Sequence, residues 1–259
     1  MIGRMLVVDC KRAFRDTFFL AIVLTLVIQF QGMGEYLSWF IQGQYHSWVL
    51  YDLHLSFNTG TFQLFMPTVA TLVYSASYLS DQQSGFLRYE LLRTGCPNGY
   101  LLSKILTTYF SALCAVFLGI LLFAAILRIR MPLESAEYPG EMASFACGTL
   151  SLEGKNFLYL LCSAFFKSAA AASWALYGLM LSTVVHSQLA IYTLPTLSCY
   201  ALNILMSQLG LSTFSCMENG IETCGVPVLD FARIYGILLI FSLAWGVFFF
   251  LKARRQVRT

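Results

Sequence analysis

The sequence predicts an all-α integral membrane protein with six transmembrane helices and an amphipathic helix at its N-terminus. Of its 259 residues, 58% are hydrophobic and only 11% are charged, whereas a soluble domain carries roughly 25% charged residues. Six apolar runs follow one another, most of them close to the ~20 residues that cross ~30 Å of hydrocarbon. Basic residues collect between alternate runs, as the positive-inside rule requires.

The six runs are 17–33, 61–79, 105–127, 157–185, 189–211 and 231–251. They leave little chain for a soluble domain, so we expect an interfacial helix at 1–16 and one membrane domain at 17–259. No small-x-small cleavage site follows the first run, which indicates an uncleaved signal anchor. The fourth run is too long for one straight crossing, and either it tilts or 157–166 lies at the outer interface. Its stretch of small residues at 168–173 favours close helix packing.

The distribution of charge sets the orientation. If both termini are cytoplasmic, eleven of the sixteen basic residues lie inside: Arg4, Lys11, Arg12, Arg15, Arg88, Arg93, Lys104, Lys252, Arg254, Arg255 and Arg258. Only Arg128, Arg130, Lys155 and Arg233 then lie outside. The sequence therefore predicts a multi-pass protein of a cell membrane, most simply a bacterial plasma membrane, with both termini in the cytoplasm.

Residues 4–16 show helical amphipathicity. One arc is apolar and holds Leu6, Val7, Cys10, Ala13 and Phe14. The opposite arc is polar and holds Arg4, Asp9, Lys11, Arg12, Arg15 and Asp16. This separation predicts a helix that lies along the inner leaflet, with its charged arc toward water.

The connections between the runs differ in character. The aromatic loop at 35–60 is expected to rest at the headgroup level, the polar loop at 128–156 to be a plain connector, and the loop at 212–230 to dip back toward the membrane. The cytoplasmic segment 80–104 is the long internal one. Its Ser80–Gln83 spacing resembles a capping box and predicts a helix start. Gly and Pro at 95–99 then predict a break.

The eight cysteines fall into three groups. Cys114, Cys162 and Cys199 lie within apolar runs and are interpreted as packing residues. Cys10 and Cys96 are cytoplasmic and expected to be reduced. Outside lie Cys147, Cys216 and Cys224. Cys216 and Cys224 bracket a short loop that a disulfide could close, but spacing alone leaves two free thiols as an equal alternative.

The cytoplasmic segment resembles the internal loop of type-2 ABC transporter permeases. In that family a polar stretch precedes a Gly, a Leu-Leu pair, a Thr or Ser and a Pro, with a Lys before the third crossing. The matching residues here are Asp81, Gly85, Leu91, Leu92, Thr94, Pro97 and Lys104. Two departures are the weakly charged Asp81-Gln82-Gln83 and the Gly95-Cys96 inserted between Thr94 and Pro97. The motif covers about a tenth of the chain, and the family's six crossings and interfacial helix extend the likeness over nearly all of it.

The resemblance implies an exporter permease that works with other proteins. Segment 80–104 would be a coupling helix, with Phe86, Leu91, Leu92 and Arg93 among its contact residues, docked in a separate cytoplasmic ATPase that binds ATP and Mg. A second permease subunit, identical or not, would complete the pathway within the bilayer. The chain itself would hold no cofactor and no catalytic site, and its substrate would be a peptide antibiotic, lipid or lipophilic drug.

Other classes of function stay open. A channel or sensor subunit would share the membrane architecture. An intramembrane enzyme is less favoured. Two of the three histidines, His46 and His54, lie in the first outside loop and His186 lies in the inner link, so they do not converge easily. No H-E-x-x-H motif and no paired intramembrane carboxylates are present. No basic patch with interleaved aromatics suggests nucleic acid, and the glycines at 148–154 do not fit a phosphate loop.

Lys167, within the fourth run, is the one basic residue that the orientation does not place. An ionisable residue in a membrane run is a functional candidate, here for the transport pathway. The alternative, which the length of the lysine stem favours, is that its ammonium snorkels to the outer interface.

Overall fold

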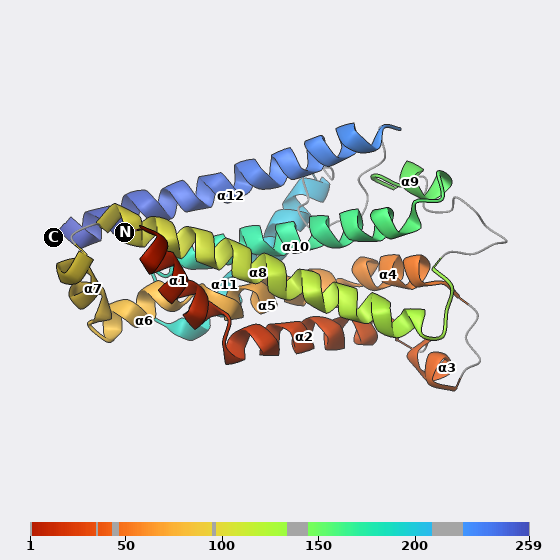
Figure 1. Cartoon of the computed structure of the whole chain (residues 1–259), viewed down its shortest axis with the longest axis horizontal. Coiled ribbons are helices and arrows are strands. Elements are labelled where there is room, and N and C mark those ends of the chain that lie inside the picture. The colour runs from red at the N-terminus through yellow and green to blue at the C-terminus, as the bar shows by residue number, and fades with distance from the viewer. Residues whose placement is uncertain are drawn as a thin grey trace.

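The computed structural model describes residues 2–34, 36–42, 47–94, 97–133, 145–208 and 225–258, and these fold almost entirely into α-helices. In chain order the helices are α1 (Ile2–Ala13), α2 (Asp16–Gly32), α3 (Tyr36–Gln42), α4 (Val49–Asn58), α5 (Gly60–Tyr74), α6 (Ser77–Gln83), α7 (Phe86–Thr94), α8 (Pro97–Arg128), α9 (Thr149–Leu152), α10 (Asn156–Leu181), α11 (Gln188–Gln208) and α12 (Pro227–Arg258). The long helices lie side by side in an elongated bundle (Figure 1). The predicted all-α class is therefore confirmed.

Four of these helices, α8, α10, α11 and α12, are long and apolar enough to cross a membrane. The chain is thus a multi-pass membrane protein. The first predicted run is α2, which follows α1 after a bend of 46° and would make a fifth crossing if the two count as one broken span. The second run is divided between α5 and α6, and the 15 residues of α5 reach only ~22 Å at the helical rise.

Helix α10 lies at the centre of the bundle and packs against α8, α12, α5 and α11. Small residues explain how closely it approaches α5. A Cβ added to Gly178 would lie 2.8 Å from the Thr71 side chain, and the Ser75 hydroxyl donates a hydrogen bond to the Ala175 carbonyl at 2.8 Å. The predicted small-residue stretch, from Ser168 to Ser173, is buried throughout. The fourth run forms this single helix, which ends at Leu181.

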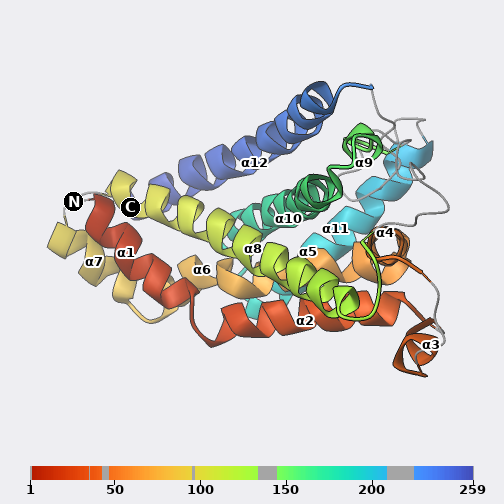
Figure 2. The same ribbon diagram turned by 45° about the vertical axis from the view of Figure 1, so that its right-hand side comes forward.

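The two ends of the bundle differ. Both termini, α6 and α7 lie at one end, and α3, α4 and α9 lie at the other (Figures 1 and 2). At the end with the termini, the Tyr78 hydroxyl donates a hydrogen bond to the side-chain oxygen of Gln256 in α12. The Gln256 amide nitrogen donates a hydrogen bond to the Thr183 carbonyl. The C-terminal helix is therefore fixed to the turn between α10 and α11.

Two connections are more ordered than the sequence predicts. The aromatic loop contains α4, which buries Val49, Leu53 and Phe57 in the main core. The polar connector also packs on the core, because its carbonyls at Pro132 and Leu133 accept the first backbone N–H groups of α4. Backbone donors at a helix start need such partners when they are buried.

An apolar groove of about 440 Å³ lies between α12 and α8. Leu102 and Tyr109 line one side, and Leu239, Gly246 and Phe250 line the other. A groove with so few polar atoms suits hydrocarbon better than water, which agrees with the placement of both helices in a membrane.

Candidate functional site

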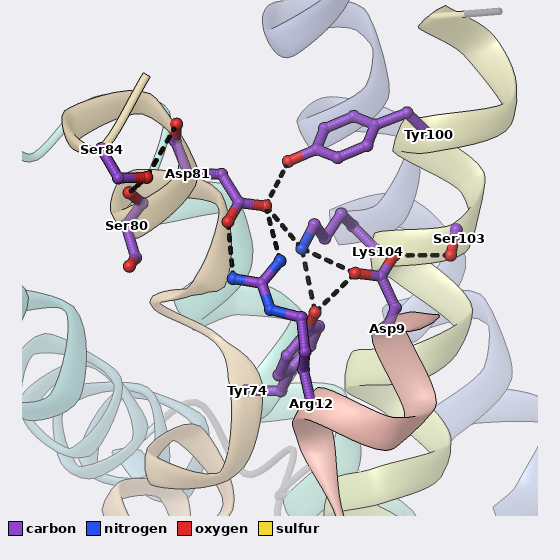
Figure 3. Close-up of polar contacts among 9 residues, drawn as sticks. All are labelled: Asp9, Arg12, Tyr74, Ser80, Asp81, Ser84, Tyr100, Ser103 and Lys104. Atoms are coloured by element: carbon purple, nitrogen blue, oxygen red, sulfur yellow. Dashed lines mark hydrogen bonds and ion pairs between the residues drawn. The ribbon is translucent and has the colours of Figure 1, made fainter. Parts of the chain in front are cut away.

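A buried cluster of charged side chains joins four helices at the end that holds both termini (Figure 3). Helix α1 contributes Asp9 and Arg12, the end of α5 contributes Tyr74, and α6 contributes Asp81. The start of α8 contributes Tyr100, Ser103 and Lys104. Two carboxylates meet two cations, so the cluster is electrically balanced. Buried charges need such pairing, because an isolated ion loses its hydration without compensation.

Lys104 is the centre of the cluster and is fully buried. Its Nζ lies 2.9 Å from Asp9 Oδ1, 2.8 Å from Asp81 Oδ2 and 2.9 Å from the Tyr74 hydroxyl. An ammonium group has three N–H donors, and here each has an acceptor. The rings of Tyr74 and Tyr100 also lie beside the ammonium, with centroids at 4.8 and 5.3 Å, a range in which cation–π attraction acts.

Each carboxylate is held by several donors. Asp9 accepts hydrogen bonds of 2.6 Å from the hydroxyls of Tyr74 and Ser103. Asp81 accepts two hydrogen bonds from the Arg12 guanidinium nitrogens, at 2.7 and 3.3 Å. It also accepts one from the Tyr100 hydroxyl at 2.7 Å. A guanidinium that binds both oxygens of a carboxylate fixes its orientation as well as its charge.

The pKa of Asp81 reflects this setting. Burial by itself raises the pKa of the carboxyl, but the hydrogen bond from Arg12 and the charge of Lys104 outweigh it, so the pKa lies below its usual value. Burial likewise disfavours the charged Arg12, and the bond to Asp81 reverses this and raises the arginine pKa. Both groups therefore stay charged near neutral pH.

The position of Asp9 corrects the sequence-based assignment of the N-terminal helix. Asp9 was placed on the arc toward water, yet it is 4% exposed and lies on one stripe with the buried Met5 and Ala13. This stripe faces α8, and the apolar Val7 and Val8 are exposed instead. Pairing with Lys104 outweighs the preference of a carboxylate for water. The sequence held a usable signal, since Asp9 is spaced by four residues from an apolar side chain on each side.

Two residues of the predicted coupling segment, Asp81 and Lys104, are brought into direct contact by this cluster. Asp81 lies in the last turn of α6, which begins at Ser77, so the prediction of a helix start at Ser80 is wrong. Gly85 follows with φ 74°, a left-handed conformation that glycine adopts without strain. This glycine turns the chain from α6 into α7.

The remaining predicted coupling residues lie in or beside α7. Phe86 is its first residue and is half-buried, and the Arg12 guanidinium lies 5.1 Å from its ring centroid. Leu91, Arg93 and Thr94 belong to the same helix, and Leu92 is 88% exposed. Pro97 begins α8, a position where its missing N–H costs no helical hydrogen bond. Gly95 and Cys96, like Cys216 and Cys224, lie outside the described residues.

Lys167 lies at the middle of α10 and is buried, 9% exposed. Its Nζ lies 5.6 Å from the ring centroid of Phe57 in α4. Helix α4 therefore packs over the ammonium, and Lys167 is buried within the protein. Burial, together with the charge of Lys167, lowers the pKa of the neighbouring His54 in α4 to about 4.

Within the described ranges, no group of three or more His, Cys, Asp or Glu side chains is arranged to hold a metal ion. Comparison of the chain with protein-family models, curated proteins and solved structures finds no match. Its function therefore has to be inferred from its own residues.

Proposed function

We propose that the chain is the transmembrane subunit of an ATP-driven ABC exporter, which forms half of a translocation pathway and is driven by a separate cytoplasmic ATPase. The observation that carries the proposal is helix α7. It lies across the end of the bundle between two breaks, and it presents apolar side chains outward. The resemblance of segment 80–104 to the coupling loop of type-2 permeases agrees with this role.

Helix α7 has a buried side and an exposed side. Leu87 packs into a small core with Tyr78, Tyr100 and Phe249. Tyr89 and Leu92 are 61% and 88% exposed. At an end of the bundle that faces water, such residues favour burial in a partner, and a few buried aromatic or aliphatic anchors dominate most interfaces. We infer that Tyr89 and Leu92 enter a groove of the ATPase.

The charge cluster would connect this helix to the membrane domain. Arg12 binds Asp81 just before α7 and lies over Phe86 at its start. Asp81 in turn contacts Lys104 of α8. Movement of α7 by an ATPase would therefore act on α1 and α8 through paired charges, which resist separation in a buried setting.

The finer topology belongs to the proposal. Helix α2, and α5 together with α6, would complete six crossings, with α1 along the inner leaflet. Both termini and α7 would face the cytoplasm of a bacterial plasma membrane. This orientation follows from the eleven basic residues assigned to that side. A second permease subunit, identical or different, would complete the pathway, and Lys167 stays a candidate to line it.

The proposed substrate class rests on the apolar and aromatic character expected of the pathway. A peptide antibiotic, a lipid or a lipophilic drug would suit a pathway lined by apolar and aromatic residues. ATP and Mg would bind to the ATPase subunit.

Copurification tests the proposal. The chain, carrying an affinity tag, is expressed with the ATPase encoded nearest to it and extracted in mild detergent. We expect the ATPase to copurify, and its hydrolysis rate to respond to the permease. Tyr89→Ala with Leu92→Ala should reduce recovery of the ATPase at least tenfold, since buried hot-spot residues contribute about 2 kcal/mol or more.

Leu152→Ala is the matched control, because Leu152 is an equally apolar residue, 61% exposed, at the opposite end of the bundle. It should leave copurification unchanged. If no ATPase copurifies with the parent chain, or if the α7 variant binds and transports normally, the exporter proposal fails and a channel or sensor subunit becomes the better explanation.

A further inference from the structure

Two cysteine thiols lie in contact near the end of the bundle opposite the termini. Cys147 precedes the short helix α9, and Cys162 lies in the second turn of α10. Cys147 is 1% exposed and Cys162 is half-buried. Cys147 belongs to the main hydrophobic core and Cys162 packs against the same core, where each thiol is the hydrogen-bonding neighbour of the other. The sequence indicated no relation between them, since it placed one in a polar connector and the other among packing residues.

The backbone holds Cys147 in an unusual conformation. Its φ of 61° makes it the single non-glycine residue with positive φ among those described, and most side chains disfavour this region. Its N–H donates to Asp230 Oδ2 at 2.9 Å, and its thiol lies 3.4 Å from the Pro227 carbonyl. Strained conformations persist where surrounding contacts fix them. Here the start of α12 fixes Cys147 against α10.

We propose that Cys147 and Cys162 are a redox-sensitive pair that closes into a disulfide on the outer face of the membrane. The oxidant is a disulfide of the surroundings, either a small molecule or a thiol oxidoreductase. The Cys162 thiolate attacks one sulfur of that disulfide, and one thiolate leaves. Cys147 then loses its proton and attacks the Cys162 sulfur, and the second thiolate leaves. Two protein thiols and the external disulfide become one disulfide within the chain and the two thiols of the reduced oxidant.

The order of attack follows from accessibility. Cys162 is the more exposed partner, so an external disulfide reaches it first. The contact with Cys162, and burial, raise the pKa of the Cys147 thiol well above its usual range, so Cys147 stays protonated until Cys162 has reacted. A thiolate is the attacking species in such exchange.

The closed disulfide would have a structural consequence. It would join residues 15 apart in the chain, enclosing α9 and the Glu153–Lys155 ion pair. The Cys147 N–H is hydrogen-bonded to Asp230 in α12. The disulfide would therefore also hold the connection between α8 and α10 against the start of α12. Oxidation would therefore limit relative movement of α10 and α12 at this end. The location of the reaction rests on the proposed orientation, since thiols facing the cytoplasm are kept reduced.

Peptide mapping tests the pair directly. Intact cells that express the chain are exposed to glutathione disulfide, free thiols are blocked with N-ethylmaleimide, and the protein is purified under denaturing conditions without reductant. Trypsin cleaves after Arg130, Lys155 and Lys167, so Cys147 and Cys162 fall in the separate peptides 131–155 and 156–167, with one cysteine each. We expect most of both peptides to be recovered as one linked species that dithiothreitol separates.

Two cysteine variants, and a second sample of oxidised, detergent-purified protein, make the outcome decisive. Cys162→Ser should abolish the linked species, while Cys114→Ser, at a membrane cysteine of α8, should leave it intact. Recovery of both peptides as maleimide adducts from cells and from oxidised, detergent-purified protein would overturn the proposal, as would linkage of Cys147 to peptide 168–233. If the link forms in purified protein but not in cells, the pairing stands and the outward orientation is wrong.

Discussion

The ammonium of Lys104 lies 2.9 Å from the carboxylate of Asp9, although 95 positions separate the two residues in the chain. This contact joins the N-terminal helix α1 to the start of α8, and the same ammonium reaches Asp81 of α6. One buried cation thus determines how three elements meet at the end of the bundle where we expect an ATPase to dock.

Lys104→Met tests this relationship. The change keeps most of the side-chain volume but leaves Asp9 without a cation and Asp81 with Arg12 alone. Breaking a buried ion pair commonly costs about 3–5 kcal/mol, so we expect a loss of that order in the free energy of unfolding, measured in detergent micelles. The exposed Lys11, changed to Met, is the control and should have little effect. Adding Asp9→Asn to Lys104→Met should recover part of the loss, and a purely additive double variant would contradict the ion-pair explanation.

Gly119 tests the close packing of α8 on α2. An added Cβ would lie 2.6 Å from Thr25 Cβ, a distance that forces the helices apart. We expect Gly119→Ala to lower stability by about 1–3 kcal/mol. Gly236→Ala is the control, since a Cβ there meets nothing within 4 Å, and alanine favours a helix over glycine by up to about 1 kcal/mol. Equal effects of the two changes would show that α2 and α8 do not approach as described.

His54 predicts a pH dependence of stability. Burial and Lys167 lower its pKa to about 4 in the folded protein, whereas an unfolded histidine has a pKa near ~6.5. The unfolded state therefore binds a proton first as pH falls. The stabilising contribution is fully present above about pH 6.5 and is lost progressively toward pH 4. Melting curves at steps across this window should show a fall in stability that His54→Gln reduces. An unchanged slope in that variant would place the titration elsewhere.

Membrane orientation can be tested by labelling. In a background without the native cysteines, single cysteines at Gln83 and Lys155, both exposed and at opposite ends of the bundle, are treated with an impermeant maleimide. In intact cells we expect labelling at 155 alone, because the basic residues place 83 inside. After permeabilisation both should react. Labelling at 83 in intact cells would reverse the orientation, and with it the proposed docking side of α7.

Much of the architecture follows from the sequence. Apolar runs and their flanking charges were sufficient to predict a helical membrane protein, because backbone groups in hydrocarbon must satisfy their hydrogen bonds within a helix. Gly and Pro at 95–99 also predicted a break, and α8 begins at Pro97 within that range. These signals depend on a few neighbouring residues, and they hold whatever the rest of the chain does.

The tertiary structure decided what the charged and thiol side chains do. Local periodicity placed Asp9 toward water, and only the arrival of Lys104 from a distant helix makes its burial favourable. In the same way, α4 covers Lys167, and α12 holds Cys147 beside Cys162. The energy of a polar group in a membrane protein depends on the partner that packing brings to it. That partner can lie anywhere in the chain, so the sequence alone determined the long apolar helices, and the packing determined the short helices and the sites.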